Sequence, residues 1–395
     1  MAFILKVCSS TWDKDSRDRR ELSVYRDLGN EVAVLAKGEA GDKGREEMVD
    51  GFKVYRYTTR PMGEGAPNFI NRFAALFTWA SFIKKLSPDV ISGHDLMPCL
   101  LIARMACIFN SKKPKLIYDS HEFELGRNVS RGKLASSVIK SLEKSLMKKC
   151  AFSIMVNDTI ADEVQKIHKL KERPVVVRST PEKWNIDEDQ CKKTREEILA
   201  GYEERLDDPF IVMYHGALTT ERGIETVIRL TSVNRNVYAY ILGFGEKDYT
   251  DILHKMAEEL NVTSRVAFHD AVNHEELWKY VGAADMSLMM IGSAAKSYYY
   301  ALPNKFFESI HSYTPIVASD FPEMKRIIDK YDIGLTCRPD DLNAVNECVE
   351  RMRTDKEFYN KCKANMAEAR NDLCWENERK ILERAYGKYI EQEMI

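Results

Sequence analysis

Short runs rich in β-branched and aromatic residues recur along the first 180 residues, each separated from the next by a segment with helical spacing. This alternation is typical of parallel α/β sheets, in which a helix returns the chain between strands. The pattern stops in the charged, weakly periodic stretch 182–208 and then restarts. The predicted strands lie in FILKVCSS, EVAVLAK, KVYRY, DVISGH, KLIYDS, FSIMV and VVVRS before this break, and in PFIVMYHG, VYAYILGFG, RVAFHD, MSLMMIG, PIVASD and GLTC after it.

The restart predicts two Rossmann-like, doubly wound parallel-sheet domains in tandem, with a hinge near residues 180–208. A chain of 395 residues is also too long for one ordinary hydrophobic core. In such sheets ligands bind at the carboxyl ends of the strands. We therefore expect the functional side chains directly after strands.

The composition, with 44% hydrophobic and 30% charged residues, is that of a globular protein and excludes disorder or a collagen-like repeat. The nine cysteines include no CxxC pair and no Cys/His cluster, so we expect reduced thiols and no metal site. The first ten residues do not form a signal peptide, and no run of about 18 apolar residues occurs. We expect a cytoplasmic protein without a membrane span or a nucleic-acid partner.

Charge is distributed unevenly between the two halves. Residues 1–180 carry 31 Lys and Arg against 22 Asp and Glu, a net charge of +9, whereas the remainder carries 28 against 39, a net charge of -11. Segment 131–150 has apolar residues near helical spacing and five lysines after Gly132 against one glutamate. Such a helix either packs on the core with a solvated outer face, which we favour, or lies on an anionic membrane surface. A peripheral contact with the inner face of a membrane therefore stays open.

The segment MYHGALTTERGIETVIRL, residues 213–230, is a candidate anion site. A buried strand ends at Gly216, Thr219 and Thr220 offer hydroxyls that could cap a helix, and Arg222 stands at the first turn of that helix. Backbone N–H groups, the helix dipole and a guanidinium would converge on an anion. A strand–turn–helix unit that binds no ligand would show the same residue pattern, so this alternative stays open.

The segment YYYALPNKFFESI, residues 298–310, predicts a second helix start, with Pro303 at the first helical position. Asn304 and Glu308 share one face, four residues apart. Carboxylates are favourable near helix starts, so a lone glutamate there needs no ligand. Two anion-binding helix starts together with an acid suited to sugar hydroxyls nevertheless match a nucleoside diphosphate and its ribose.

Three segments, YHGALTTERGIETVI, ALPNKFFESIHSYTPIVASDFPEMKRII and YDSHEFE, together resemble the family 4 retaining glycosyltransferases of the GT-B fold. The resemblance covers most of the chain and is strongest in residues 210–330. It implies that a nucleotide sugar, which we expect to carry UDP, binds across an interdomain cleft from its acceptor. It also implies retention of the anomeric configuration without a metal or cofactor. The expected acceptor is a cell-surface glycan, a polysaccharide or a lipid-linked precursor.

The resemblance also implies a division of the chain and roles for single residues. Residues 1–185 form the N-terminal, acceptor-binding domain, 186–372 form the nucleotide-sugar-binding domain, and 373–395 form a helix that packs back on the first domain. His121, Arg222 and Glu308 are the candidate catalytic residues: His121 lies near the donor sugar, Arg222 neutralises the departing diphosphate, and Glu308 holds the ribose. The other donor-site candidates are Gly216, Gly243, His269, Leu302, Pro303, Asn304 and Lys305.

The candidates on the acceptor side follow two predicted strands of the first domain. SGHDLMP places His94 and Asp95 after one strand, and YDSHEFE places His121 and Glu122 after the next. Two histidine–acid pairs at neighbouring strand ends favour a functional role over a structural one. Arg17 is the remaining candidate, because its segment replaces the glycine-rich turn that is usual in the family.

Two further departures from the family pattern bear on activity. Tyr300 occupies the place of the first of two acids spaced eight apart, and Ala217 occupies the place of a basic residue, for which Lys305 is a candidate substitute. Two alternatives to a transferase stay open. One is a UDP-sugar epimerase of the same fold, and the other is a non-catalytic subunit that binds a glycan or a partner enzyme.

Overall fold

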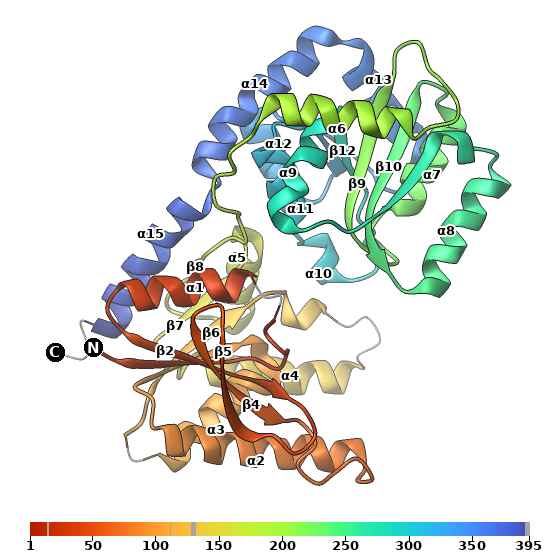
Figure 1. Cartoon of the computed structure of the whole chain (residues 1–395). Coiled ribbons are helices and arrows are strands. Elements are labelled where there is room, and N and C mark those ends of the chain that lie inside the picture. Colours follow the sequence, from red (N-terminus) through yellow and green to blue (C-terminus); the bar gives the residue numbers. More distant parts are fainter. Residues whose placement is uncertain (14–15, 111, 128–131, 392–395) are drawn as a thin grey trace. The chain divides into compact units, whose positions relative to one another are not determined.

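A computed structural model describes residues 1–13, 16–110, 112–127 and 132–391. The chain divides into two compact units. Unit 1 comprises residues 1–178 and 378–395, and unit 2 comprises residues 179–377 (Figure 1). The chain therefore passes from unit 1 to unit 2 after Arg178 and returns after Asn377.

Unit 1 is built on an eight-stranded sheet with the strand order β3-β4-β2-β1-β5-β6-β7-β8. All neighbouring strands are parallel except β3 and β4, which form an antiparallel pair. The strands are β1 (Phe3–Val7), β2 (Glu31–Gly38), β3 (Lys43–Val49), β4 (Phe52–Thr58), β5 (Val90–His94), β6 (Lys115–Ser120), β7 (Phe152–Met155) and β8 (Val175–Val176).

Helices cover both faces of this sheet, as expected for a doubly wound fold. Figure 1 shows α1 on one side of the sheet and α2, α3 and α4 on the other. Helix α15 joins α1, because the rings of Tyr25 and Tyr386 lie 5.2 Å apart. The helices are α1 (Ser16–Asp27), α2 (Asn68–Leu86), α3 (Leu101–Phe109), α4 (Lys133–Met147), α5 (Asp158–His168) and α15 (Trp375–Tyr386).

Unit 2 is built on a six-stranded, all-parallel sheet with the strand order β11-β10-β9-β12-β13-β14. Its strands are near-continuous apolar runs because both faces are buried. They are β9 (Phe210–Leu218), β10 (Val237–Gly245), β11 (Val266–Asp270), β12 (Met286–Met289), β13 (Ile316–Ser319) and β14 (Gly334–Cys337).

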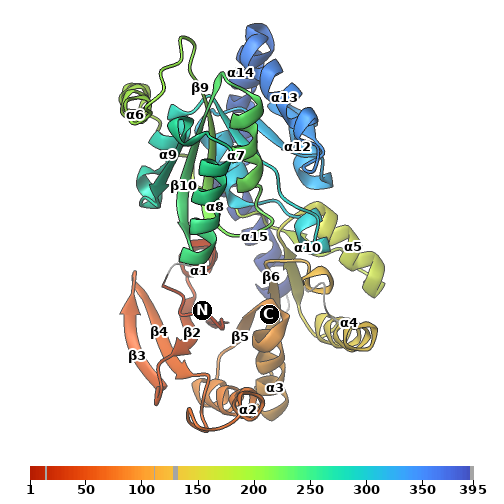
Figure 2. The ribbon, with the colours of Figure 1, turned by 90° about the vertical axis from the view of Figure 1, so that its right-hand side faces the viewer.

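The helices of unit 2 bury their apolar stripes on the two faces of its sheet. One face packs against α7, α8 and α13, and the other against α6, α9, α11 and α12. Figure 2 shows α6 and α9 on one side of β10 and α7 on the other. The helices are α6 (Glu188–Ala200), α7 (Ile224–Val233), α8 (Lys247–Glu259), α9 (His274–Ala283), α10 (Lys296–Tyr299), α11 (Asn304–His311), α12 (Pro322–Tyr331), α13 (Leu342–Thr354) and α14 (Lys356–Asp372).

The tandem doubly wound fold is confirmed, and each predicted strand segment contains a strand. Two elements were missed. Strand β3 is a mostly exposed edge strand whose charged sequence KGREEMV lacks a clear strand pattern. Helix α6 lies inside the stretch that we read as a hinge; its first turn is capped by the side chain of Asp187, and it buries only Cys191, Thr194 and Ile198.

Within the described residues, no helix is long and apolar enough to cross a membrane. All nine cysteines are free thiols, as expected from their spacing.

Candidate functional site

The start of α11 brings a buried lysine and a buried glutamate together in unit 2. The helix begins at Asn304, one residue later than predicted, and Pro303 directly precedes it. Lys305 and Glu308 are the second and fifth helical residues, and both are buried. The backbone N–H groups of a helix start carry a partial positive charge. The site thus combines a lysine, a carboxylate and free backbone donors.

Lys305 is in an unfavourable position for a cation. Its ammonium group has no hydrogen-bond partner among the described residues, and it lies 3.8 Å from the centre of the Tyr214 ring. Burial and the nearby charge of Arg222 lower the pKa of Lys305 to about 7. The positive end of α11 adds to this cost. An anion bound here would relieve all three effects.

Glu308 is held ionised by two histidines. His215 Nε2 donates a hydrogen bond to Oε2 of Glu308 at 3.0 Å, and His274 Nε2 lies 3.5 Å from Oε1. Burial alone would raise the pKa of Glu308, but these two contacts outweigh it and lower the pKa to about 2. Each carboxylate oxygen can still accept a second hydrogen bond. Glu308 is therefore a preorganised acceptor for hydroxyl groups.

Arg222 lies just before α7 rather than in its first turn. The helix begins at Ile224, and Gly223, with a φ angle of 79°, precedes it in a left-handed conformation. No side chain caps this start, so the predicted capping by Thr219 and Thr220 is wrong. The Arg222 guanidinium stacks over the Tyr298 ring at 5.1 Å. Tyr298 therefore orients Arg222.

Gly216 and Gly243, near the ends of two neighbouring strands of unit 2, each have a structural cause. Strand β9 continues through Gly216 to Leu218, and Gly216 pairs with Gly243 of β10. A Cβ atom on Gly243 would lie 1.9 Å from the Gly216 carbonyl oxygen, and Gly216 has a φ angle of 122°. Close approach of the two strands explains Gly243, and the positive φ angle explains Gly216, both without a ligand.

The remaining donor-site candidates differ in exposure. Leu302 is buried, Pro303 is half-buried and Asn304 is exposed at the helix start. His269 is exposed at the end of β11, where its Nδ1 lies 2.7 Å from the Asp270 carbonyl oxygen. Its ring lies 5.3 Å from that of Tyr280.

A cavity of about 890 Å³ in unit 2 is lined in part by the loop that precedes α7. Its charged lining is mainly acidic, with Arg338 as the lone basic side chain. The acids are Glu221, Glu225, Asp320 and Asp340. Repulsion by these acids makes this cavity a poorer place for a diphosphate than the start of α11.

In unit 1, His121 belongs to a buried charge network at the carboxyl end of the sheet. Its Nε2 atom lies 3.0 Å from Asp119 and 3.5 Å from Asp18. Burial opposes a charge on the ring, but the carboxylates outweigh burial and raise the pKa of His121 to about 10. The two carboxylates therefore favour the charged form of the His121 ring. The ring of His94 lies 3.8 Å away and contacts Asp18 through Nδ1 at 2.8 Å.

Four of these side chains, Asp18, His94, Asp119 and His121, have the composition of a metal site. However, the Lys6 ammonium ion-pairs with both carboxylates, and its distance to Asp18 is 2.8 Å. The cluster is therefore a network of ion pairs in which Lys6 already supplies the cation.

The structure brings the acceptor-side candidates to the same edge of unit 1, with different environments. Asp95 accepts a hydrogen bond from the His121 backbone N–H at 3.0 Å. Asp95 and the exposed Glu122 both form ion pairs with Arg127. Arg17 is buried and donates to the Val177 carbonyl and to Asp119. Arg17 is thus part of the network beneath this edge.

Comparison with known proteins decides the family. Residues 195–369 match the family model of glycosyl transferases group 1, and residues 22–180 match that of glycosyltransferase family 4. The chain belongs to the family 4 glycosyltransferases of the GT-B fold. An uncharacterized glycosyltransferase from Methanocaldococcus jannaschii is 25% identical over 384 residues, which cover 90% of each chain.

Solved structures of other glycosyltransferases share this fold. Sucrose-phosphate synthase from Thermosynechococcus elongatus has a TM-score of 0.78 at 16% identity, over 99% of this chain and 100% of that chain. The Anabaena protein HepE in complex with UDP has a TM-score of 0.77 at 12% identity, over 98% and 100%. HepE has also been solved with UDP-glucose.

Tyr300 and Ala217 stand where the resemblance implies an acid and a basic residue, and the structure shows the surroundings of Tyr300. Its ring is buried, lies 5.5 Å from that of Tyr299, and has the Lys296 ammonium 5.7 Å from its centre. An aromatic side chain packed in this way has no carboxylate with which to bind a sugar hydroxyl.

Sequence reasoning missed several residues of the glycosyltransferase site. His215 and His274 bond Glu308, Tyr214 and Tyr298 lie against Lys305 and Arg222, and Lys6 neutralises the acids around His121. His215 directly precedes Gly216, so its place at a strand end was a usable signal. His274, which opens α9, and Lys6, which lies inside β1, do not stand at the end of a strand and carried no such signal.

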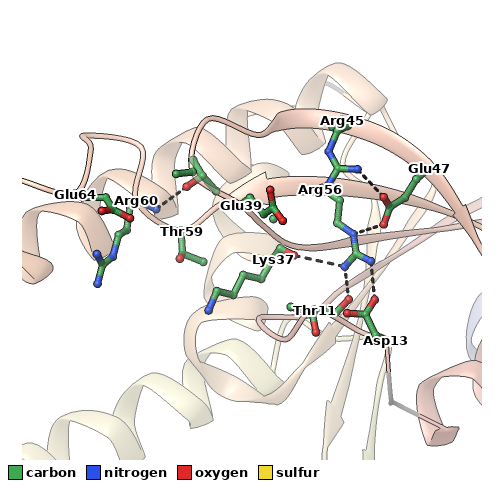
Figure 3. A pocket seen from close by; sticks show the side chains of 13 residues that line it. Thr11, Asp13, Lys37, Glu39, Arg45, Glu47, Arg56, Thr59, Arg60 and Glu64 are labelled. Atoms are coloured by element: carbon green, nitrogen blue, oxygen red, sulfur yellow. Dashed lines mark hydrogen bonds and ion pairs between the residues drawn. The ribbon is translucent and has the colours of Figure 1, made fainter.

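Unit 1 of the glycosyltransferase also holds a polar cavity of about 580 Å³ at the carboxyl ends of β2 and β4 (Figure 3). Arg56 forms its floor and ion-pairs with Asp13 and Glu47. Four charged side chains of the lining form no ion pair with another described residue. They are Lys37, Glu39, Arg60 and Glu64. The other lining residues are Thr11, Gly38, Ala40, Arg45, Thr58 and Thr59.

Proposed function

We propose that this glycosyltransferase moves a sugar from a UDP-type donor to a cell-surface glycan, a polysaccharide or a lipid-linked acceptor, with retention of the anomeric configuration. The donor nucleotide is supported by HepE, which shares the fold and has been solved with UDP and with UDP-glucose. Retention rests on the sequence resemblance to the retaining enzymes of the family.

The observation that carries the proposal is the unpaired, buried ammonium group of Lys305 at the start of α11. A buried cation beside Arg222 and a positive helix end is costly, and the contact with the Tyr214 ring offsets part of this cost. The arrangement becomes favourable when a diphosphate supplies the missing negative charge. Lys305 thus takes over the role of the basic side chain that Ala217 lacks.

The same groups would promote the reaction. When the bond between sugar and phosphate breaks, negative charge builds on the departing phosphate oxygen, and fixed positive charges there stabilise the transition state. Arg222 and Lys305 supply this charge without a metal ion. Glu308, held by His215 and His274, would accept hydrogen bonds from the ribose hydroxyls. The backbone of residues 302–305 would lie against the donor.

In unit 1, we assign the acceptor to the polar cavity over β2 and β4. Its threonine hydroxyls and unpaired charges suit a hydroxylated sugar, and it offers no aromatic or large apolar side chain to an aglycone. The His121 imidazolium, which the network keeps charged, would stabilise negative charge on the donor sugar or its leaving group.

Calorimetry with a panel of nucleotides and nucleotide sugars tests the donor assignment. We expect the tightest binding from a UDP compound, and a loss of about tenfold or more in Glu308→Ala because hydrogen bonds to a charged group are lost. His254→Ala, which removes a side chain of α8, is the matched control. Unchanged UDP affinity in Glu308→Ala would show that the ribose assignment is wrong.

NMR of the donor during incubation separates the candidate activities. A transferase hydrolyses its donor slowly and accelerates when the acceptor is added, with the new linkage in the donor's anomeric configuration. Isomerised UDP-sugar would favour the epimerase, and an unchanged donor with every acceptor would favour a non-catalytic subunit.

A further inference from the structure

Helix α2 of unit 1 exposes a row of large apolar side chains. Phe69, Phe73 and Phe77 recur at intervals of four residues and are 73%, 64% and 45% exposed. Ile70 lies beside them and is also exposed. The rings of Phe73 and Phe77 are 5.0 Å apart, so they form a continuous ridge. A cluster of this kind in water usually marks an interaction surface.

The charged side chains of α2 itself have one sign. Helix α2 contains no acidic residue, and its basic residues are Arg72, Lys84 and Lys85. Lys84 is exposed and stands eleven residues after Phe73, so it projects within about 20° of that side chain around the helix axis. A partner for this helix must combine an apolar interior with negative charge.

Helix α4, on the same face of the sheet, repeats the pattern (Figure 1). Leu134 and Val138 are 82% and 58% exposed, and Lys133 and Lys140 beside them are exposed too. The single acid of α4, Glu143, is buried and bonded to Tyr118 and His168. Leu146 and Met147 pack inward instead. Thus α4 packs against the core, as we favoured, and still presents an apolar, basic outer side.

We propose that the exposed faces of α2 and α4 bind the surface of a lipid bilayer that contains anionic phospholipids. Apolar side chains at the boundary between headgroups and acyl chains, with lysine and arginine at the phosphates, are typical of interfacial helices. A second copy of the chain is a poorer occupant, because a symmetric contact would bring the basic residues of two α2 helices together.

The location connects this surface with the acceptor. The cavity assigned to the acceptor includes Arg60 and Glu64, and residues 65–67 lead from there directly into α2. The starts of α2 and α4 also lie at the carboxyl edge of the sheet, where the cavity opens. The membrane surface therefore favours a lipid-linked acceptor over a free polysaccharide, a choice that rests on the proposed function.

Co-sedimentation with vesicles tests the proposal. We expect the protein to bind phosphatidylcholine vesicles that contain phosphatidylglycerol at low salt, and to be released at high salt because screening weakens the basic contacts. The double variant F69S/F73S should weaken binding by about tenfold or more, since each ring loses a buried contact with lipid. Lys84→Glu with Lys140→Glu should do the same.

Matched controls and a mass measurement complete the design. Ile252→Ser and Lys247→Glu change exposed residues of α8 in unit 2 and should leave vesicle binding unchanged. The proposal would be overturned if the protein failed to bind vesicles at low salt, or if F69S/F73S bound them as well as the wild type. It would also be overturned if light scattering showed a dimer of the wild type that F69S/F73S converts to a monomer. UDP affinity should be the same in all these variants. A failed membrane proposal would therefore be distinguishable from a failed donor assignment.

Discussion

At the scale of single residues, Lys305 shows how the free protein holds a buried basic group at the proposed donor site. Burial and Arg222 hold the pKa of this lysine at about 7 instead of its ordinary value of 10.5. Above pH 7 the free protein therefore loses the proton, and a bound diphosphate must restore it. Affinity and protonation are linked through this one group.

We expect UDP affinity to fall as the pH rises from 7 to 9, with proton uptake on binding. Over this range the terminal phosphate is already ionised, because phosphate groups lose their second proton near pH 6. Lys305→Met should bind UDP about tenfold or more weakly and without this pH dependence, since a charged contact is lost. Calorimetry in buffers of different ionisation enthalpy measures both effects, and Lys255→Met, at an exposed position on α8, is the control.

The same lysine predicts an effect on stability with a defined sign. Between pH 7 and 10.5 the unfolded chain binds more protons at Lys305 than the folded one, so folding becomes more favourable as the pH rises. Below pH 7 Lys305 is charged in both states, and the folded protein bears the full free-energy cost of burying that charge. At pH 6 without nucleotide, Lys305→Met should therefore stabilise unit 2 by about 0.5–2 kcal/mol, as for other residues retained for function. A lower midpoint of thermal unfolding than in the wild type would contradict this.

At the scale of elements, the ion pairs at the carboxyl end of the unit 1 sheet join α1, β1 and β6. Lys6 lies on β1 and contacts Asp18 of α1 and Asp119 of β6, and all three side chains are almost completely buried. The two carboxylates keep their pKa values well below the ordinary range, although burial opposes this. Removing the lysine takes away the cation that contacts both carboxylates, and leaves them the contacts with Arg17 and the two neighbouring histidines.

We expect Lys6→Met to destabilise unit 1 by on the order of 3–5 kcal/mol, the typical result of breaking a buried ion pair from one side. Lys43→Met, an exposed position on β3, should change stability by about 0.5 kcal/mol or less. Urea unfolding followed by hydrogen exchange in residues 1–178 measures both. Equal midpoints for the two variants would refute a structural role for the network.

The pairing of β9 with β10 gives a second test at this scale. A Cβ atom on Gly243 would meet the Gly216 carbonyl oxygen at 1.9 Å, whereas one on Gly65 would meet nothing within 4 Å. Gly243→Ala should therefore destabilise unit 2 by about 1–3 kcal/mol through strain between the strands. Gly65→Ala should be nearly neutral, and thermal unfolding compares them.

At the scale of the whole molecule, the last helix belongs to the first unit. Glu378 accepts hydrogen bonds from the backbone and guanidinium of Arg178, and Leu382, Tyr386 and Ile390 are completely buried. Arg379 ion-pairs with Asp27 of α1. The chain end is therefore part of the packing of unit 1.

Truncation after Asn377 should destabilise unit 1 by about 3 kcal/mol or more, because several fully buried side chains are lost together. Unit 2 keeps its own sheet and donor-site residues, so UDP should still bind. Hydrogen exchange measured by mass spectrometry should show faster exchange in residues 1–178 and continued protection by UDP within 179–377. Loss of UDP protection would show that the units depend on each other for folding.

Much of the fold followed from patterns with a short range along the chain. Apolar strands and helical spacing specify a doubly wound sheet, because the two periods of 2 and 3.6 residues differ clearly. Strand β3 and helix α6 lacked these patterns, since exposed or weakly buried elements place few constraints on their residues. Arg222, Lys305 and Glu308 were identifiable because they follow strands or open helices.

The sequence by itself determined the family, the tandem sheets and the candidate side chains at strand ends. Only the tertiary structure decided which of them meet: His215 and His274 with Glu308, Lys6 with Asp18 and Asp119, and Arg17 in the network below the surface. These contacts join residues far apart along the chain. No local pattern encodes them, because their cause is burial, which makes an unpaired charge costly and favours contacts between groups that the sequence separates.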